Sequence, residues 1–276
     1  MSAPELRDVR GPGALGGGWP RTRDLLVLIA ATEFKRAYFG TVLGYVWTLM
    51  RPLLLFGVLL AVFTQAFHLG ASVKHYPVLL LLNIVLFGMF QEATTNAVTS
   101  VVAKEGIVRK TQFPRLVIPL AVVLTALFNL GMNLIVVAVF LLAFGVDPQW
   151  TWLLLPVLVL ALTVFTTAVS MIVSSLYPRF RDVAIIWSVA ATALFYATPV
   201  LYPLTAAPGS FRRVIELNPL APIFELTHKW IVDGSVPGPI ALSGWRLAIP
   251  AAIYVVTCAV AVWTFNREAP RIAEAL

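Results

Sequence analysis

The chain has 276 residues, of which 59% are hydrophobic and 12% are charged, and its mean hydropathy is +0.88. Soluble domains carry about 25% charged residues, so this composition excludes a water-soluble globular domain and predicts an all-α polytopic membrane protein. The net charge of +7 fits basic cytoplasmic loops that face anionic lipid headgroups, and we expect no nucleic-acid partner.

Residues 1–20 are rich in glycine and proline and lack the apolar core of a signal peptide. We expect them to form a disordered cytoplasmic tail ahead of a single transmembrane domain over residues 21–276. Within 21–40, the apolar run Leu25–Ala31 is too short to cross a bilayer and has charged residues on both sides. This pattern predicts a helix that lies in the cytoplasmic membrane interface.

About six apolar stretches are long enough to span a bilayer, which takes roughly 20 residues. They cover about 43–67, 77–102, 116–144, 152–176, 183–201 and 247–265. An even number of spans puts both termini on the same side of the membrane. Lysine and arginine concentrate before the first span, after the last, and in the connections that follow the second and fourth spans. The positive-inside rule therefore places both termini in the cytoplasm.

Two charged residues are expected at the cytoplasmic ends of spans. Arg51 lies inside the first apolar stretch, and we expect its side chain to snorkel to the boundary, with the span itself beginning near Pro52. Asp182 directly precedes the fifth span, where it is expected either to cap the helix or to contact a cytoplasmic partner.

The second span has polar residues along one helical face of its second half. These residues lie at i, i+3, i+4, i+7 and i+8, and they are Glu92, Thr95, Asn96, Thr99 and Ser100. Such a face cannot point at lipid, so it either packs against another helix or lines a hydrophilic conduit. A second stripe, Thr125, Asn129 and Asn133, lies in the third span, where hydrogen bonding between helices is the favoured interpretation.

The segment 202–245, between the fifth and sixth spans, contains six prolines and is nevertheless apolar. It is too broken to cross the bilayer and predicts one or two re-entrant helices that dip in from outside. Such backbone is tolerated only where protein or a water-filled cavity covers it, which points to a transport pathway. We expect Glu225 to lie near the membrane surface and to form a salt bridge with His228 or Lys229.

Several kinds of chemistry lack their sequence signals. There is no G-x-x-x-x-G-K-[ST] phosphate loop, no G-x-S-x-G, no H-E-x-x-H and no closely spaced carboxylate pair. The single cysteine, Cys258, cannot form an intrachain disulfide, and the sequence has no cluster that predicts a metal site. Few charges lie near the middle of a span, which disfavours a proton relay. Energy for uphill transport must therefore come from a partner.

The chain resembles the membrane permeases of type-2 ABC exporters, within the branch that exports polysaccharide, O-antigen and teichoic acid. The resemblance runs from about Leu25 to Phe265. It rests on the order and spacing of YFGTVLGYVWTLMRPLL (Tyr38–Leu54), KEGIVRKTQFPRLVIPL (Lys104–Leu120), SLYPRFRDV (Ser175–Val183), TPVLYPL (Thr198–Leu204) and LNPLAPIFELTHKWIVDG (Leu217–Gly234).

This resemblance implies a permease in the bacterial inner (plasma) membrane, in which two copies of the chain form a pore above two separate ATP-binding subunits. No cofactor is expected in this chain, because ATP and Mg would bind to the partner ATPase. The implied cargo is a glycan attached to a polyprenyl-diphosphate lipid, which would leave the cytoplasm through the pore within the surrounding membrane lipid.

The resemblance also implies roles for particular residues. The ATPase-coupling residues are Lys104, Glu105, Arg109, Lys110, Arg181 and Asp182. The substrate entrance is Lys35, Arg36, Tyr38 and Arg51, whose basic members suit an anionic diphosphate. The pore lining is Glu92, Thr95, Asn96, Thr99, Phe195 and Tyr196, and the outward re-entrant part includes Tyr202, Asn218, Glu225 and Trp230. The aromatic residues among them fit either a membrane-boundary belt or stacking platforms for sugar rings.

Two alternatives remain open from the sequence. A type-2 ABC permease for a lipid or drug without a glycan would share this topology, although the re-entrant segment and the aromatic content argue against it. A membrane-bound glycosyl- or phospholipid-transferase would need clustered acidic residues for a metal ion, whereas the acidic residues here are scattered.

Overall fold

A computed structural model describes residues 18–38, 44, 46–66, 73–104, 106, 116–207 and 209–275, which contain helices and turns and no strand. Five helices in this part of the chain are long and apolar enough to cross a membrane. They are α2 (Val46–Gln65), α4 (Tyr76–Ala103), α6 (Val117–Ala143), η1 with α7 (Trp150–Leu176), and α11 with α12 (Pro239–Glu268 of their combined length). The predicted all-α polytopic membrane protein is therefore confirmed.

The fifth predicted span forms a shorter helix, α8 (Val183–Ala197), of 15 residues. At 1.5 Å per residue it is about 22 Å long, which is less than the roughly 30 Å of a bilayer core. It ends because Thr198, which precedes Pro199, adopts an extended conformation with ψ of 145°. The α conformation is disfavoured before a proline, so the helix stops four residues before the predicted boundary.

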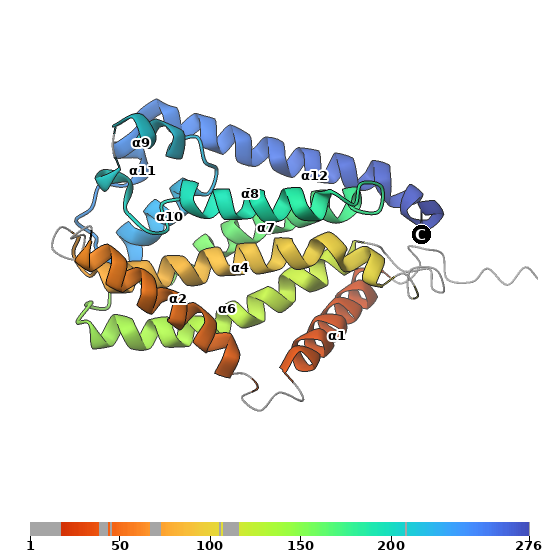
Figure 1. Cartoon of the computed structure of the whole chain (residues 1–276), viewed down its shortest axis with the longest axis horizontal. Helices are drawn as coiled ribbons and strands as arrows, with labels where there is room; N and C mark the ends of the chain where they lie inside the picture. The colour runs from red at the N-terminus through yellow and green to blue at the C-terminus, as the bar shows by residue number, and fades with distance from the viewer. Residues whose placement is uncertain are drawn as a thin grey trace, which may run out of the picture.

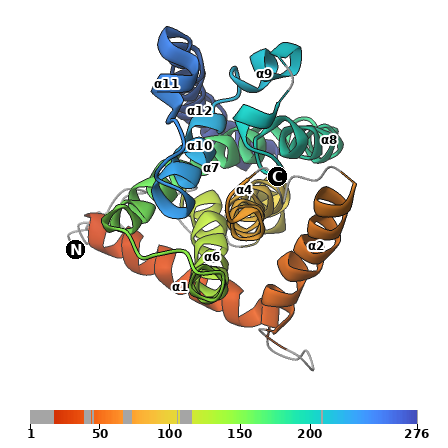
Figure 2. The same cartoon turned by 90° about the vertical axis from the view of Figure 1, so that its left-hand side faces the viewer.

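The long helices run side by side along the long axis of the molecule, and α4 lies in the middle of the bundle (Figures 1 and 2). It contacts α2, α6, α7 and α8. Its first half, from Tyr76 to Phe90, is almost completely buried. This agrees with its sequence, which is apolar on every side, as expected of a helix surrounded by other helices.

Successive helices alternate in direction, so the bundle has two distinct ends (Figure 1). At the end that we call the basic end, α4, α7 and α12 finish at Ala103, Leu176 and Ala275. At the opposite end, which we call the looped end, lie η1, α9, α10 and α11. The described helix ends that flank the predicted cytoplasmic connections after the second and fourth spans, and the end of α12, therefore lie at one end of the molecule.

Helix α1 (Gly18–Tyr38) begins near the basic end and lies obliquely against α6 (Figures 1 and 2). It begins three residues before the predicted interface helix, with Pro20 in its first turn, where the missing N–H costs little. Ala30 is fully buried, and the rings of Phe34 and Phe128 meet edge to face at 5.7 Å. The contact with α6 therefore buries one side of α1.

The segment predicted to be re-entrant is largely helical. Its elements are η2 (Leu204–Ala206), α9 (Gly209–Ile215), α10 (Ala221–Thr227), the π-helical turn η3 (His228–Val232), α11 (Pro239–Ser243) and η4 (Gly244–Leu247), after which α12 runs over Ala248–Ala275. Helix α10 packs against α7, and the buried ring of Phe224 lies 6.4 Å from that of Phe87 in α4. The segment thus joins the core of the bundle, although its sequence is broken by prolines.

The extended backbone after α8 is buried, and side chains of α4 hydrogen-bond to it. The Tyr76 hydroxyl donates to the carbonyl of Leu201 at 2.7 Å. The Asn83 amide donates to the carbonyls of Pro199 and Val200 at 3.2 and 3.3 Å. Backbone carbonyls away from water must find such partners, so these two side chains allow the chain to leave the helix inside the bundle.

Candidate functional site

A cavity of about 1000 Å³ lies between α2, α4 and α6, with one residue from α8 on its wall. Viewed from the looped end, α2 stands apart from α4 and α6 on this side of the molecule (Figure 2). The cavity has apolar walls with polar side chains set into them, and these polar residues are Thr48, Arg51, Gln91, Glu92, Thr95, Asn96, Asn129 and Asn133.

The polar face of α4 supplies much of this lining. Thr95, Asn96 and Thr99 are exposed, although the helix that carries them is otherwise mostly buried. Ser100, by contrast, is buried and donates to the carbonyl of Ala97 in its own helix at 2.8 Å. The predicted five-residue face therefore has four members, and Ser100 belongs to the packed side of α4.

A carboxylate, two amides and a guanidinium meet inside the cavity. The Asn129 amide donates a hydrogen bond to Oε1 of Glu92, and the Asn133 amide donates to the carbonyl of Asn129 at 2.9 Å. Arg51 of α2 lines the same cavity. A polar side chain within a helical bundle is costly unless it is paired, and the hydrogen bond from Asn129 of α6 provides a partner for Glu92. The predicted hydrogen bonding between helices by the α6 stripe is confirmed at Asn129.

Helix α2 begins before the expected start of the span near Pro52. It begins at Val46, so Pro52 lies inside it. Arg51 consequently sits on a formed turn of helix and contributes to the cavity wall. Trp47, whose residue surface is 52% exposed, lines the same wall one turn earlier.

The other predicted entrance and pore residues divide into two groups. Phe195 joins Glu92, Thr95 and Asn96 in the cavity lining. Thr99, Tyr196, Lys35 and Arg36 are exposed but are not part of that lining. Tyr38 is the last residue of α1, and the position of its side chain lies outside what the structure describes.

The predicted coupling residues lie at the basic end where they are described. Lys104 Nζ lies 3.2 Å from Oε1 of Glu33 in α1, and the lysine side chain is only 15% exposed. Arg181 and Asp182 are exposed in the turn between α7 and α8. Asp182 occupies the N-cap position of α8, but its side chain makes no capping hydrogen bond, so the predicted cap is wrong. Glu105, Arg109 and Lys110 lie outside the described residues.

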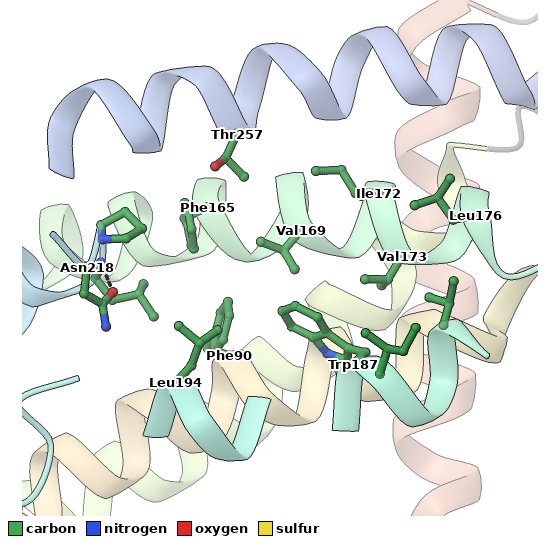
Figure 3. A pocket seen from close by; sticks show the side chains of 14 residues that line it. Phe90, Phe165, Val169, Ile172, Val173, Leu176, Trp187, Leu194, Asn218 and Thr257 are labelled. Atoms are coloured by element: carbon green, nitrogen blue, oxygen red, sulfur yellow. Dashed lines mark hydrogen bonds between the residues drawn. The ribbon is translucent and has the colours of Figure 1, made fainter. Parts of the chain in front are cut away.

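A second hollow, of about 390 Å³, lies between α7, α8 and α12 and has an almost wholly apolar lining (Figure 3). Leu194 of α8 faces this hollow, whereas the next residue, Phe195, lines the polar cavity. Helix α8 therefore stands between a polar space on one side and an apolar one on the other.

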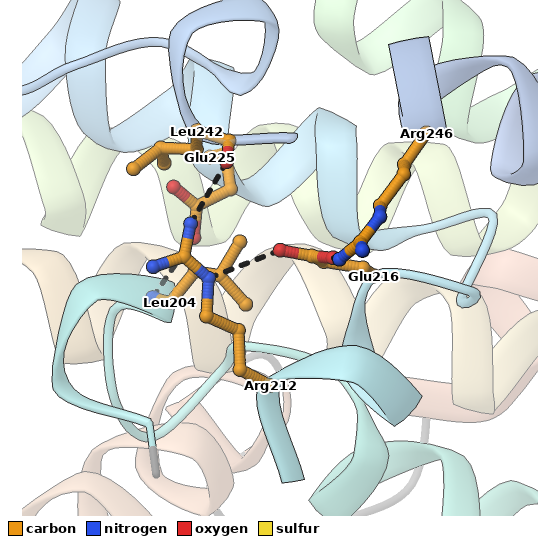
Figure 4. Close-up of polar contacts among 6 residues, drawn as sticks. All are labelled: Leu204, Arg212, Glu216, Glu225, Leu242 and Arg246. Atoms are coloured by element: carbon orange, nitrogen blue, oxygen red, sulfur yellow. Dashed lines mark hydrogen bonds and ion pairs between the residues drawn. The ribbon is translucent and has the colours of Figure 1, made fainter. Parts of the chain in front are cut away.

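The looped end contains a buried carboxyl group, that of Glu225, which the sequence analysis had placed near the membrane surface (Figure 4). Glu225 is 3% exposed, and its Oε1 accepts the backbone N–H of Leu204 at 3.0 Å. The predicted salt bridge to His228 or Lys229 is not formed. Burial raises the pKa of Glu225 to about 7, since the carboxylate loses water and gains little in return. Burial also lowers the pKa of His228.

An arginine–glutamate network closes the same end (Figure 4). Arg212 of α9 donates through Nε to Oε1 of Glu216 at 3.0 Å and through Nη2 to the carbonyl of Leu242 in α11 at 2.9 Å. Arg246 lies 3.7 Å from Glu216 Oε2. The i, i+4 spacing of Arg212 and Glu216 was a readable signal for the first of these contacts, whereas the contacts to α11 and η4 depend on the tertiary fold.

The remaining predicted outward residues mostly hold backbone in place. The Asn218 amide donates to the Thr198 hydroxyl at 2.8 Å, and the Tyr202 hydroxyl donates to the carbonyl of Tyr196 at 2.8 Å. The carbonyl of Trp230 accepts a hydrogen bond from the hydroxyl of Thr151. The first two contacts fix the end of α8 and the segment that follows it, and the third joins η1 to η3.

A bundle of membrane-spanning helices around a polar cavity places the chain among multi-pass membrane proteins with an internal polar space. Residues 24–230 match the family described as ABC-2 type transporter, and the chain belongs to this family.

Curated relatives cover most of the chain. An O-antigen export system permease protein RfbA of Klebsiella pneumoniae is 30% identical over 254 residues, which is 92% of this chain and 95% of the relative. RfbA of Myxococcus xanthus is 31% identical over 72% of this chain and 76% of its own length. The polysialic acid transport protein KpsM of Escherichia coli is 24% identical over 75% of this chain and 81% of its own length. These relatives are named as permease or transport proteins, in agreement with the prediction of a transport subunit and not an enzyme.

Proposed function

We propose that this chain is the transmembrane subunit of an ATP-driven exporter that moves a lipid-linked polysaccharide across the bacterial inner membrane. The observation that carries the proposal is the polar cavity between α2, α4 and α6. The names of the curated relatives, two of which concern O-antigen export and one polysialic acid transport, support a polysaccharide cargo.

The exposed polar face of α4 supports a dimer. Thr95, Asn96 and Thr99 would be in contact with lipid if the chain worked alone, which is unfavourable for a polar stripe in a membrane. A second copy that presents the same surface would cover the stripe by two-fold symmetry and enclose a polar path between the subunits. Both copies would then contribute to one pore.

The chemistry of the cavity suits an anionic lipid-linked sugar chain. Arg51 offers a guanidinium that matches the geometry of phosphate oxygens, and Lys35 and Arg36 are exposed on α1 to attract the diphosphate head. Glu92, Thr95 and Asn96 offer hydrogen-bonding groups for sugar hydroxyls. Trp47 and Phe195 offer aromatic faces on which sugar rings can stack and slide.

The coupling to ATP is assigned to the basic end, in the cytoplasm. Two copies of a separate subunit would bind ATP and Mg there and would contact the segment that includes Glu105, Arg109 and Lys110, together with Asp182. Because Lys104 pairs with Glu33, a displacement of this segment would act on α1 as well as on α4. Closure of the ATPase pair would thus move α4, which borders the cavity, together with α1, which packs against α6.

The cavity proposal is tested by blocking it. Asn96→Trp should reduce export of the glycan at least ten-fold, because a large ring would fill the path beside α4 while the variant still reaches the membrane. The matched control is Val139→Trp on the outer face of α6, where the residue is 59% exposed and lines neither hollow. Equal export by the two variants would show that the cargo does not pass along this face of α4.

A further inference from the structure

The apolar hollow behind α8 has the form of a groove that is open to the outside of the bundle. Val169 and Val173 of α7 form its floor, Trp187 and Leu194 of α8 form one side, and Thr257 of α12 lies on the other (Figure 3). Ile186, which also lines the groove, is 65% exposed, so the groove is reached from the surface of the molecule. Within a membrane, that surface is bathed by lipid chains.

The length of the groove matches one lipid leaflet. Along α7 it extends from Phe165 to Leu176, eleven residues further on. At 1.5 Å per residue this is about 16 Å, which is about half of the roughly 30 Å bilayer core. Asn218 and Leu220 close the groove on the side of the looped end. The space is therefore the right size for one acyl chain of the leaflet at the basic end.

Two arginines lie where the headgroup of such a lipid would be. Leu176 and Val183, at the end of the groove, flank the turn that carries Arg179 and Arg181. Both arginines are exposed, and their guanidinium groups lie 5.2 and 5.1 Å from the ring centres of Phe180 and Tyr177. Asp182 is the acidic neighbour, so the turn keeps a net positive charge that favours an anionic headgroup.

We propose that the groove between α7, α8 and α12 binds one anionic phospholipid of the membrane, with an acyl chain against Trp187 and Leu194 and the headgroup phosphate on Arg179 and Arg181. This site is separate from the proposed cargo path, because α8 lies between them. The bound acyl chain fills the space behind α8. It thereby supports the helix in the position from which Phe195 reaches the polar cavity.

The test is to count bound lipids on the full chain. The protein is reconstituted into nanodiscs with equal amounts of phosphatidylcholine and phosphatidylglycerol, released, and weighed by native mass spectrometry. One phosphatidylglycerol should remain on each chain, preferred over phosphatidylcholine by about ten-fold or more, the size expected for two basic residues at an anionic headgroup. Equal retention of the two lipids, or retention of none, overturns the proposal.

Two variants distinguish the site of the acyl chain from the site of the headgroup. Thr257→Trp should fill the groove and remove the retained lipid, whereas Val255→Trp, on the outer face of the same helix where the residue is 64% exposed, should not. The double change Arg179→Gln and Arg181→Gln lies on an exposed turn, where substitutions usually cost little stability, and it should abolish the preference for phosphatidylglycerol. If Thr257→Trp dissociates a dimer and leaves the lipid count unchanged, a second copy covers the groove and the proposal is wrong. The lipid count needs neither ATPase nor glycan, so its failure is distinct from failure of the export proposal.

Discussion

Three asparagines have the same physical task in this protein, which is to donate amide hydrogen bonds to acceptors on other elements of the bundle. Asn83 donates to the backbone after α8, Asn129 donates to the Glu92 carboxylate, and Asn218 donates to the hydroxyl of Thr198. Of these, only Asn129 lay in a stripe that predicted hydrogen bonding between helices. Asn83 sits in the nearly pure apolar half of the second span, where periodicity gives no sign of its role.

Asn129→Ala should destabilise the protein because it removes a donor from a carboxylate that is mostly out of water. The expected loss of unfolding free energy is about 1–3 kcal/mol, the cost of an unmet hydrogen bond to a charged group. The measurement is thermal unfolding in detergent. Asn133→Ala is the control, since that amide donates to a carbonyl of its own helix, and its melting temperature should fall much less. A larger effect from Asn133→Ala would contradict the role given to Asn129.

Glu225 should make stability depend on pH. Its pKa of about 7 in the folded protein lies above the usual 4.5, so the folded state binds the proton more tightly than the unfolded state does. Protonated Glu225 therefore favours the folded state. This contribution to the free energy of unfolding is complete below pH 4.5, declines between pH 4.5 and 7, and is absent above pH 7, a change of about 3 kcal/mol. The effect of Glu225→Gln on the melting temperature, measured against the wild-type protein, should therefore be more favourable at pH 8 than at pH 5.

The comparison of wild type with Glu225→Gln isolates the effect of Glu225, because His228 is present in both proteins. The effect of His228 also has the opposite direction. Burial lowers the pKa of His228, so this residue costs stability as the pH falls below 6.5, in the variant and in the wild-type protein alike. Glu216→Gln, which removes the partner of Arg212 and Arg246, should lower the melting temperature without removing the pH effect of Glu225. Parallel melting curves for wild type and Glu225→Gln from pH 5 to 8 would disprove the assignment.

At the scale of elements, α1 and α4 are joined at the basic end by the ion pair of Glu33 and Lys104. Composition and charge predicted α1 as a helix, but the partner of Lys104 could not be foreseen because the two residues are 71 positions apart. The same limit applies to α8. Its start agreed with the prediction, whereas its early end followed from local chemistry at Thr198 and Pro199, which hydropathy alone does not register.

Exchange of the two charges tests the coupling through α1. Lys104→Glu should weaken the contact and reduce transport, since it places two carboxylates together, and Glu33→Lys should do the same with two ammonium groups. The double variant, in which the charges are exchanged, should recover most of the activity. The measurement is glycan export in cells with equal amounts of each permease in the membrane. No recovery in the double variant would mean that Lys104 acts through another contact.

At the scale of the whole molecule, the order and approximate bounds of the long apolar helices could be predicted from the sequence. The length of the apolar stretches was sufficient to place five helices that are long enough to cross a membrane and a sixth, α8, that is shorter. The internal arrangement could not be predicted, because it depends on which faces meet. Glu225 shows this most clearly. It was expected at the membrane surface, but it is buried, and its carboxylate accepts the backbone N–H of Leu204 in η2.

The same limit applies to the candidate site. The spacing of Glu92, Thr95 and Asn96 predicted a shared polar face but left open whether that face packs or lines a space. The structure brings it together with Arg51 and Phe195, from helices on either side, around a cavity. Lys35 and Arg36, which were predicted to join them, remain on α1 and do not reach the cavity lining.

The most direct test of the export proposal is purification of the permease from membranes in mild detergent, followed by measurement of ATP hydrolysis with and without lipid-linked glycan. We expect a complex that contains two copies of this chain and two copies of an ATP-binding subunit, and whose ATP hydrolysis rises when the glycan lipid is added. Recovery of this chain without a nucleotide-binding partner, or hydrolysis that is unchanged by the glycan lipid, would contradict the proposal.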